Sequence, residues 1–411
     1  MTFDRAAILA LDAADPLAGF RDRFAIPDGC IYLDGNSLGP RPVAALDRAA
    51  HVVGVEWGVD LIKSWNTAGW FELPTRLGDR LAPLIGAGTG EVVVTDATGI
   101  NLFKAMAAAV AMRPDRDTII LEGSNFPTNN YMAQGLAALS GGRLQVKLLE
   151  KDEIAGAIDT RTAAIAVTHV HYKTGHIHDM PGLTARAHEA GALAIWDLCH
   201  SAGAMPVDLN GAGADFAVGC TYKYLNGGPG SPAFLFAARR HHGQAIQPLT
   251  GWWGHAEPFA FRPTYAPAGD IRQFLTGTQP IVSLSLAELG LDIACAADIG
   301  AVRKKSMALT DLFIRLAEQR CPEMFGVASP RAAEDRGSQV SLTHPEGYAI
   351  MRALIDRGVI GDFRAPDIVR FGFAPLYLRY LDVWDAVDIL AEIMATAAWR
   401  RPEYQVREAV T

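Results

Sequence analysis

The sequence has few features of a membrane protein or a nucleic-acid-binding protein. Its longest apolar stretches, such as residues 105–112, are far shorter than the roughly 20 residues that a helix needs to span a bilayer. Basic residues are in deficit, with 37 lysines and arginines against 45 acidic residues and a formal net charge of -8. A field of that sign repels phosphate backbones and anionic lipids. We therefore expect neither nucleic acid nor membrane as a partner.

Cysteine is also scarce, and its pattern argues against a disulfide framework. The five cysteines are an odd number, and no two of them form a C-x-x-C pair. They are Cys30, Cys199, Cys220, Cys295 and Cys321. Scattered thiols of this kind are typical of a reducing compartment. Aspartates at positions 4, 12 and 15 interrupt the region where an export signal would be apolar, so we expect a cytoplasmic protein.

Short apolar runs alternate with helix-like segments through the middle of the chain. The runs are residues 91–95, 118–123, 144–150, 163–170, 193–198, 215–220 and 233–238. Most are apolar on both faces, as strands covered by helices on both sides of a sheet must be. Amphipathic segments such as 101–113 and 183–192 lie between them. This alternation predicts an α/β fold with a mainly parallel, doubly wound sheet.

The pattern changes after Gln279-Pro280, which indicates a second domain. Residues 283–299 and 301–318 look helical, and a strand-like run follows at 369–375. We expect a large domain over residues 46–284 and a smaller α+β domain over residues 285–411. The N-terminal segment, residues 1–45, is expected to pack with the smaller domain.

Asp197 and Lys223 form the strongest candidate site. Asp197 ends one predicted strand and Lys223 follows the next, so both should lie at the carboxyl edge of the sheet, where ligands bind in such folds. Glycines at 227, 228 and 230 let the backbone pass close to a bound group. Pyridoxal phosphate needs this layout, with a lysine amine for the Schiff base and a carboxylate on the pyridine nitrogen. The alternative is a helix-capping acid and a surface lysine beside a glycine turn.

Two further motifs suit the same cofactor. The amides of Ala97 and Thr98, together with the Thr98 hydroxyl, offer phosphate donors at a predicted helix start, although they also suit an ordinary N-cap. Phe126 follows the strand 118–123 and offers an aromatic face for a flat ring. A buried core role for Phe126 is the alternative, but its neighbours are residues typical of loops.

Motifs across the chain resemble those of bacterial kynureninases, in the same order and from about residue 8 to the C-terminus. They are YLDGNSLG (32–39), SWNTAGW (64–70), FPT (126–128), DLCHSAG (197–203), TYKYLNGGPG (221–230), GWWGH (251–255), GTQPI (277–281) and RFGFAPLY (370–377). Kynureninases are pyridoxal-phosphate enzymes of the aspartate-aminotransferase fold type, fold type I. They cleave L-kynurenine to anthranilate and L-alanine. The resemblance implies the same fold, cofactor and reaction for this chain.

The resemblance also implies roles for individual residues. Lys223 is the expected Schiff-base lysine, Asp197 the pyridinium partner and Phe126 the stacking ring, with His200 close to the cofactor. The remaining expected cofactor-binding residues are Ala97, Thr98, Pro127, Thr128, Asn129, Tyr222, Trp252 and Thr278. In this family, the counterparts of Trp252 and Thr278 come from the neighbouring subunit, which implies an obligate homodimer. Tyr222 is expected either to shuttle protons or to bind only the phosphate.

Asn129 departs from the family pattern, which usually has aspartate after Phe-Pro-Thr. We expect its amide to hydrogen-bond the phenolic oxygen of the cofactor ring without supplying a negative charge there. The missing charge should lower the pKa of the imine at Lys223 relative to an aspartate-bearing relative.

Three residues are expected to bind substrate. Arg370 is our choice for the α-carboxylate, because a guanidinium binds carboxylates through two hydrogen bonds. Arg364 is its nearest rival, and a surface arginine at a strand end is the alternative. Ser37 and Trp65 are expected to line the slot for the aniline ring, although Trp65 could instead belong to the core or an interface. The sequence leaves the choice between kynurenine and 3-hydroxykynurenine open.

The run from His169 to His178 contains residues that could be mistaken for a metal site or for a second Schiff-base lysine. Four histidines in ten residues suggest a metal site, but Asp179 is the only nearby acid, so we expect His171, His176 and His178 to decorate a loop and bind no metal. Lys173 in this run is a rival Schiff-base lysine that lacks a preceding strand-end aspartate.

Other functions remain as alternatives. A cysteine desulfurase would need a mobile reactive cysteine, for which Cys321 is the loop-like candidate, and an aminotransferase would use the same cofactor. A non-catalytic regulator would need a partner module, and the sequence has no spare segment for one.

Overall fold

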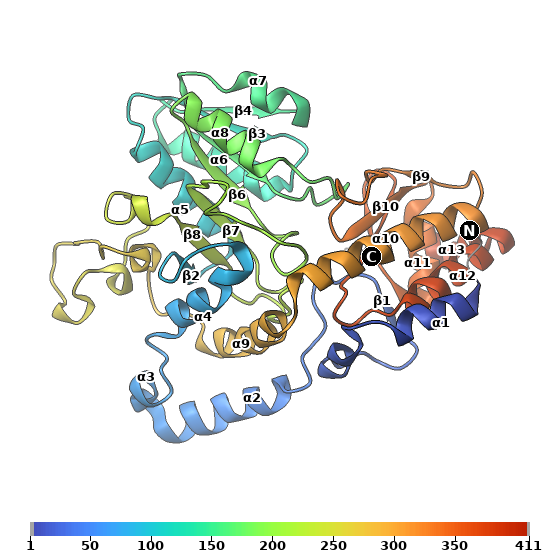
Figure 1. Ribbon diagram of the computed structural model, residues 1–411. Coiled ribbons are helices and arrows are strands. Elements are labelled where there is room, and N and C mark those ends of the chain that lie inside the picture. Colours follow the sequence, from blue (N-terminus) through green and yellow to red (C-terminus); the bar gives the residue numbers. More distant parts are fainter. Residues whose placement is uncertain (1–3, 409–411) are drawn as a thin grey trace.

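A seven-stranded sheet forms the centre of the larger part of the molecule (Figure 1), in a computed structural model that describes residues 4–408. The strand order is β2-β8-β7-β6-β5-β3-β4. The strands are β2 (Val92–Val94), β3 (Thr118–Glu122), β4 (Gln145–Leu149), β5 (Thr162–Thr168), β6 (Leu193–Asp197), β7 (Phe216–Gly219) and β8 (Phe234–Ala237). Each lies in a predicted apolar run, except that β5 begins one residue before its run. Strand β8 pairs antiparallel with both neighbours and all other pairs are parallel, which confirms the mainly parallel sheet.

Helices cover both faces of this sheet. Alternate residues of a strand point to opposite faces, and on β6 Ile195 packs in one apolar cluster while Trp196 packs in the other. The covering helices include α4 (Leu73–Leu81), α5 (Thr98–Ala111), α6 (Pro127–Leu139), α8 (Met180–Glu189) and α9 (Ile281–Ala296). Because the inner strands are buried on both faces, their apolar runs do not alternate with polar residues.

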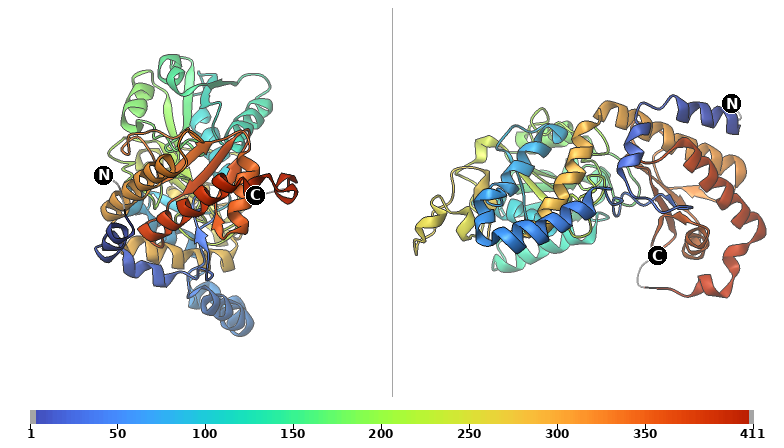
Figure 2. Two further views of the ribbon diagram at one scale, coloured as in Figure 1. Left: turned by 90° about the vertical axis from the view of Figure 1, so that its right-hand side faces the viewer. Right: turned by 90° about the horizontal axis from the view of Figure 1, so that it is seen from below.

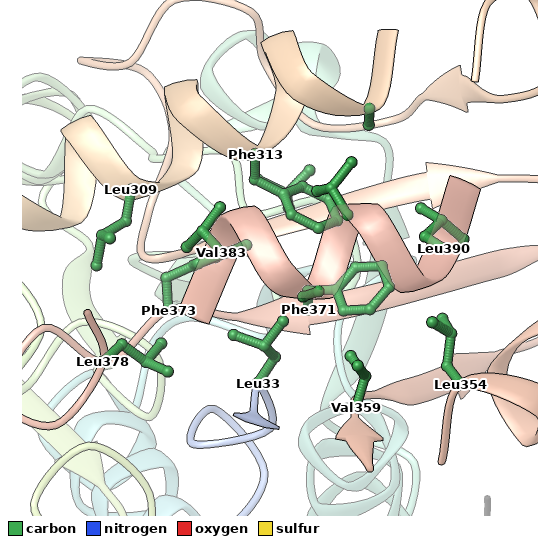
Figure 3. Close-up of a cluster of buried hydrophobic side chains, with 14 of the residues drawn as sticks. Leu33, Leu309, Phe313, Leu354, Val359, Phe371, Phe373, Leu378, Val383 and Leu390 are labelled. Carbon is green, nitrogen blue, oxygen red and sulfur yellow. The ribbon is translucent and has the colours of Figure 1, made fainter. Parts of the chain in front are cut away.

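The smaller part of the molecule is an antiparallel sheet with helices against it. Its strand order is β12-β13-β10-β9, and its core, shown in Figure 3, packs residues such as Phe313, Phe371 and Leu390 together. Its elements are α10 (Ile299–Arg320), β9 (Gly326–Val327), β10 (Gln339–Thr343), α11 (Gly347–Asp356), β11 (Val359–Ile360), β12 (Asp362–Arg364), β13 (Ile368–Gly372), α12 (Tyr380–Thr396) and α13 (Pro402–Gln405).

The N-terminal segment lies against this smaller part (Figure 2). Helix α1 (Arg5–Ala13) packs on α12, and strand β1 (Ile31–Tyr32) pairs in parallel with β11. Leu33 enters the same core as Phe371.

Helix α9 packs mainly with the larger part, whereas we expected most of it to belong to the smaller domain. Leu284, Leu291 and Ala294 on α9 pack into the core of the larger part, on the face that carries α4. Most buried apolar residues of α9 therefore pack with the larger part, although Ile293 near its end packs in the core of the smaller part. The apolar face of α9 fits both domains by pattern alone, and its position in space decides between them.

The remaining helices are short or lie at the edge of the molecule. They include α2 (Ala45–His51), the π-helix η2 (Val52–Asp60), the 3-10 turn η3 (Leu61–Lys63), α3 (Ser64–Thr67) and α7 (Ile154–Ala157), together with several other 3-10 turns. Among residues 4–408, no helix has the length and apolar character needed to cross a bilayer.

Candidate active site

A pocket of about 250 Å³ lies at the carboxyl ends of the central strands. Asp197 at the end of β6 and Lys223 after β7 both line it, as the parallel sheet requires. Its other walls are Ala97, Thr98, Gly99, Asn125, Phe126, Thr128, Asn129, Thr168, Tyr172, Cys199, His200, Tyr222, Gly230, Ser231 and Ala233. The fold thus gathers most of the expected cofactor-binding residues into one cavity. Pro127 is exposed at the first turn of α6 and does not line it.

The Asp197 carboxylate is buried and held from both sides. Its Oδ1 accepts a hydrogen bond from the Cys199 amide at 2.9 Å, and its Oδ2 accepts one from Asn129 Nδ2 at 2.8 Å. Asp197 is 6% exposed. These two donors fix the orientation of the carboxylate.

His200 is held by Gln339 from the smaller part of the molecule. Gln339 Nε2 donates to the carbonyl oxygens of Tyr172 and His171 at 2.7 and 3.3 Å, so its Oε1 faces His200 Nδ1 at 3.0 Å. His200 Nδ1 must then carry the proton, and its bare Nε2 faces Lys223 Nζ at 3.0 Å. Burial, with the nearby charge of Lys223, lowers the pKa of His200, which keeps the ring neutral.

The N-terminus of α5 faces the pocket without a capping side chain. Its N-cap residue is Ala97, which has no side chain able to cap, while Thr98 and Gly99 line the cavity. The preceding Asp96 has φ +48°, an uncommon conformation for a residue other than glycine. Asp96 accepts a hydrogen bond at 2.7 Å from Lys104, whose side chain is fully buried. This arrangement leaves backbone amides available to an anion at the pocket.

Phe126 presents an aromatic face at the mouth of the pocket. It is 46% exposed, so it does not belong to the core, and its ring meets Tyr172 edge-on at 5.4 Å between centroids. A residue with an apolar face left open beside a cavity suits a flat ligand ring.

Asn129 contacts another expected cofactor-binding residue. Its Nδ2 donates to Asp197 Oδ2, on the carboxylate expected to hold the ring nitrogen. Helix α6 sets this direction, because Asn129 lies in its first turn and is 5% exposed beside β6. Asn129 therefore orients the Asp197 carboxylate, and its expected effect on the imine stays a prediction.

Arg370 is neither a surface residue nor a free guanidinium. It is 2% exposed, and it forms a two-point ion pair with Asp362, with Nε donating to Oδ1 at 2.8 Å and Nη2 donating to Oδ2. Nη2 also donates to Ser37 Oγ at 2.8 Å, and Nη1 donates to the Tyr172 carbonyl oxygen at 2.5 Å. Although burial acts to raise it, the charge of Arg370 lowers the pKa of Asp362 to about 2. Arg364 also donates to Asp362, at 2.6 Å.

Several expected site residues do not line this pocket: besides Pro127, they are Ser37, Trp65, Trp252, Thr278 and Arg370. Trp65 packs against Trp253 at 5.2 Å and Trp252 at 6.2 Å between ring centroids, in an aromatic cluster of its own. Thr278 is exposed on the segment before α9. Within one chain, therefore, Trp65, Trp252 and Thr278 do not contact the cavity, and the predicted slot for the aniline ring is not formed by Trp65 of the same chain.

Tyr222 lines the pocket as a neutral phenol. Burial raises its pKa, and the neighbouring thiols of Cys220 and Cys199 act in the same direction. A proton shuttle would need the opposite shift, whereas a protonated phenol suits a hydrogen bond to a phosphate oxygen.

The histidine run is a buried cluster and not a loop decoration. Asp179 caps α8 and does not contribute its carboxylate to the histidine cluster. The acid that faces the histidines is Glu122, at the end of β3. His171 and His178 are buried at 3% and 4% exposure. The sequence could not show this acid, because only the pairing of β3 with β5 brings it to the run.

Neither rival nucleophile suits catalysis. Lys173 Nζ donates to the Ala365 carbonyl oxygen at 3.2 Å and does not line the pocket. Cys321 is the buried C-cap of α10, and burial raises its pKa to about 11. It is therefore not a mobile thiolate.

Sequence reasoning missed Gln339, Asp362 and Tyr172. Gln339 and Asp362 belong to strands of the smaller part, far along the chain from the residues they contact. No local motif marks them, since the contact depends on how the two parts pack. Tyr172 follows β5, and its position after a strand could have indicated it.

Comparisons with known proteins decide the family. A family model described as the kynureninase C-terminal domain matches residues 302–390. The kynureninase of Burkholderia pseudomallei strain 1106a is 57% identical over 413 residues and covers 99% of both chains. That of Pseudomonas fluorescens is 56% identical over 409 residues and covers 98% of both. The chain belongs to the kynureninase family.

Solved structures show the fold of this kynureninase-family chain. A cysteine desulfurase from Thermococcus onnurineus NA1 has a TM-score of 0.77 at 19% identity, covering 92% of this chain and 98% of its own. A mutant of C-DES with glycine covalently linked to its PLP cofactor has a TM-score of 0.74 at 16% identity, covering 95% of this chain and 100% of its own. The predicted type I fold of pyridoxal-phosphate enzymes is confirmed.

Proposed function

We propose that this protein is a kynureninase, which uses pyridoxal phosphate to hydrolyse the Cβ–Cγ bond of L-kynurenine, giving anthranilate and L-alanine. The observation that carries the proposal is the convergence of Lys223, Asp197 and the uncapped start of α5 on one cavity, in a member of the kynureninase family. A cysteine desulfurase is disfavoured because Cys321 is buried and its pKa is raised.

The residues of the cavity fit pyridoxal phosphate. Lys223 Nζ would hold the aldehyde carbon, Asp197 the ring nitrogen, and Phe126 the ring face. The free amides of α5 offer a place for the phosphate, where a capping side chain is missing. The bound cofactor supplies an electron sink for carbanions formed at the substrate.

Protein side chains orient the substrate and hold protons at defined atoms. Tyr222 keeps a proton on its hydroxyl oxygen in the neutral range, because burial raises its pKa. His200 Nε2 accepts from Lys223 Nζ, since Gln339 holds the proton on Nδ1. For the α-carboxylate we retain Arg370: a carboxylate would replace the neutral oxygens of Ser37 and Tyr172, because charged acceptors bind guanidinium more strongly.

Purified protein supplied with pyridoxal phosphate should convert L-kynurenine to a fluorescent product with the spectrum of anthranilate. Lys223→Ala should lose at least a thousandfold in kcat, whereas the matched variant Lys173→Ala should keep it. Absence of anthranilate from protein that has bound the cofactor contradicts the proposal, and sulfide release from L-cysteine supports a desulfurase instead. The ratio of kcat/KM for kynurenine and 3-hydroxykynurenine then sets the preferred substrate.

We also propose a homodimer with shared active sites. Large apolar side chains are exposed along α2, η2 and η3, a segment that runs along the lower edge of the molecule in Figure 1. They are Leu46 (64%), Val53 (45%), Val55 (42%), Trp57 (61%), Val59 (66%), Leu61 (58%) and Ile62 (76%). Trp252 and Thr278 lie outside the cavity of their own chain, so a role for them there requires a second chain.

Mixing two inactive variants tests the shared site. Lys223→Ala and Thr278→Glu should each be inactive alone, since one lacks the lysine and the other places an anion near the phosphate. In a random mixture, hybrid dimers carry one intact site, so activity should return to about one quarter of wild type. No recovery in a mixture that native mass spectrometry shows to contain hybrid dimers contradicts shared sites. A monomer of unchanged activity contradicts the dimer itself.

We infer a cytoplasmic location. All five cysteines are free thiols, and Cys220 and Cys321 are buried, as suits a reducing compartment.

A further inference from the structure

Three ligand-type side chains meet outside the cofactor pocket. Glu122 ends β3 and is 1% exposed, while His176 and His178 lie on the hairpin that follows β5. The hairpin is closed by backbone hydrogen bonds, from the His171 amide to the His176 oxygen and from the His178 amide to the His169 oxygen, both at 2.9 Å. Because alternate residues of an extended chain point to the same side, both imidazoles face Glu122.

The distances among these groups match those of a metal site. His176 Nε2 lies 3.0 Å from His178 Nε2, and the Glu122 oxygens lie 3.5 Å from His176 Nε2 and 3.0 Å from His178 Nε2. Ligands held about 2.0–2.1 Å from a tetrahedral ion are separated by about 3.3 Å. One atom from each residue can be chosen so that all lie within 4.8 Å of one another. Because Glu122 turns Oε1 toward His176 and Oε2 toward His178, both of its oxygens are placed to bind.

The surroundings fix the tautomer of His176. His171 Nε2 faces the Ser124 carbonyl oxygen at 3.0 Å and must donate, so His171 Nδ1 is bare and accepts from the Thr174 amide at 3.2 Å. The Thr174 hydroxyl then donates to His171 Nδ1 at 3.0 Å and accepts from His176 Nδ1 at 2.9 Å. His176 Nε2 therefore directs a lone pair at Glu122 and His178. Orienting contacts of this kind are typical of metal-binding histidines.

We propose that Glu122, His176 and His178 bind a divalent transition-metal ion such as Zn²⁺, with water as the fourth ligand. Two nitrogens and a carboxylate are a ligand set that Zn²⁺ accepts. In the metal-free protein, one proton lies between the two facing Nε2 atoms. When the ion binds, that proton moves to His178 Nδ1, so that both Nε2 atoms offer lone pairs and both rings stay neutral. The His176 side chain is 13% exposed and gives the ion its route of entry.

The ion would join two segments that line the cofactor pocket. Glu122 leads into the loop that carries Asn125 and Phe126, and the hairpin carries Tyr172. A bridge between them restrains both walls, so the ion has a structural role. Its ligands are not among the residues that line the cavity.

Metal binding to the full-length, tag-free protein tests this site. After dialysis against a chelator, titration with Zn²⁺ should show one ion bound per chain and a raised apparent Tm, and Co²⁺ should give the visible absorption of a tetrahedral complex. Glu122→Gln and His176→Asn should each weaken binding at least tenfold. His51→Asn, at a histidine whose side chain is 54% exposed elsewhere, is the matched control and should bind as wild type does.

Metal binding and kynureninase activity can be tested independently of each other. Lys223→Ala should lose activity and still bind one ion. Absence of saturable binding, or equal affinity in wild type and His176→Asn, overturns the site whatever the activity. His176→Asn keeps the test decisive if Glu122→Gln does not fold, because His176 lies nearer the surface than Glu122.

Discussion

Asn129→Asp tests how the protein controls the charge of Asp197. Asn129 Nδ2 donates to Asp197 Oδ2 at 2.8 Å, and both residues are about nine-tenths buried or more. The substitution keeps the shape of the side chain and replaces a donor with a second carboxyl group. Two carboxylates at that separation cannot both ionise freely, so the pair must retain a proton.

The distance sets the size of the effect. Two unit charges 2.8 Å apart at an effective dielectric constant of about 20 repel by about 6 kcal/mol, equivalent to roughly four pKa units. A shared proton relieves part of this repulsion, so we expect the folded pair to keep one proton well above the pH at which the unfolded chain releases it. The folded variant then holds a proton that the unfolded chain has released. Its stability therefore falls as pH rises from about 4 to the raised pKa, and is level above it.

Apparent Tm values of the cofactor-free protein between pH 5 and pH 8 measure this loss. The gap between wild type and Asn129→Asp should widen with pH. Asn130→Asp is the control: Asn130 is also buried, at 6% against 5% exposure, but its amide faces the Gly123 carbonyl oxygen and not a carboxylate. The variant should also bind pyridoxal phosphate more weakly, because the retained proton removes charge from Asp197. A gap that stays constant with pH, or that Asn130→Asp reproduces, refutes the reasoning.

Three further predictions follow from buried groups. Gln339→Leu leaves His200 Nδ1 and two carbonyl oxygens without their hydrogen-bond partner. We therefore expect a loss of about 2–4 kcal/mol in the free energy of unfolding and a shifted pH profile of kcat. An unchanged profile would show that Gln339 does not set the His200 tautomer. Burial and the charge of Asp362 raise the pKa of Asp34 to about 8, so the folded protein retains a proton above pH 4 and Asp34 costs stability increasingly up to pH 8. Asp34→Asn should therefore gain in Tm over wild type between pH 5 and pH 8, and a gain that does not grow with pH contradicts this. Gly290→Ala would place a methyl group 2.1 Å from a backbone oxygen, so thermal unfolding should start at least several degrees lower; an unchanged Tm would contradict the close packing of α9.

Much of the fold and part of the site could be predicted from local sequence. Strands buried on both faces are recognisable because their runs are apolar throughout, and the seven runs all contain strands of one sheet. Asp197 and Lys223 could be placed together because side chains that follow neighbouring strands meet at one edge. The antiparallel direction of β8 could not be predicted, since a short apolar run does not show in which direction its strand crosses the sheet.

Contacts between distant segments could not be predicted. Gln339 on His200, Asp362 on Arg370 and Glu122 on His178 each join parts of the chain far apart in sequence. A pattern of residue types records which face of an element is apolar, but not which polar atom of another element will lie opposite it.

The order of amino acids thus determined the elements, the parallel sheet and the pair of residues at its edge, because these depend on periodicity and on the geometry of neighbouring strands. Only the folded molecule decided that Arg370 is already paired with Asp362, that Asn129 faces Asp197, and that Trp65 lies away from the cavity of its own chain. Those outcomes depend on how side chains meet across packed elements, where separations of a few ångströms decide charge and hydrogen bonding.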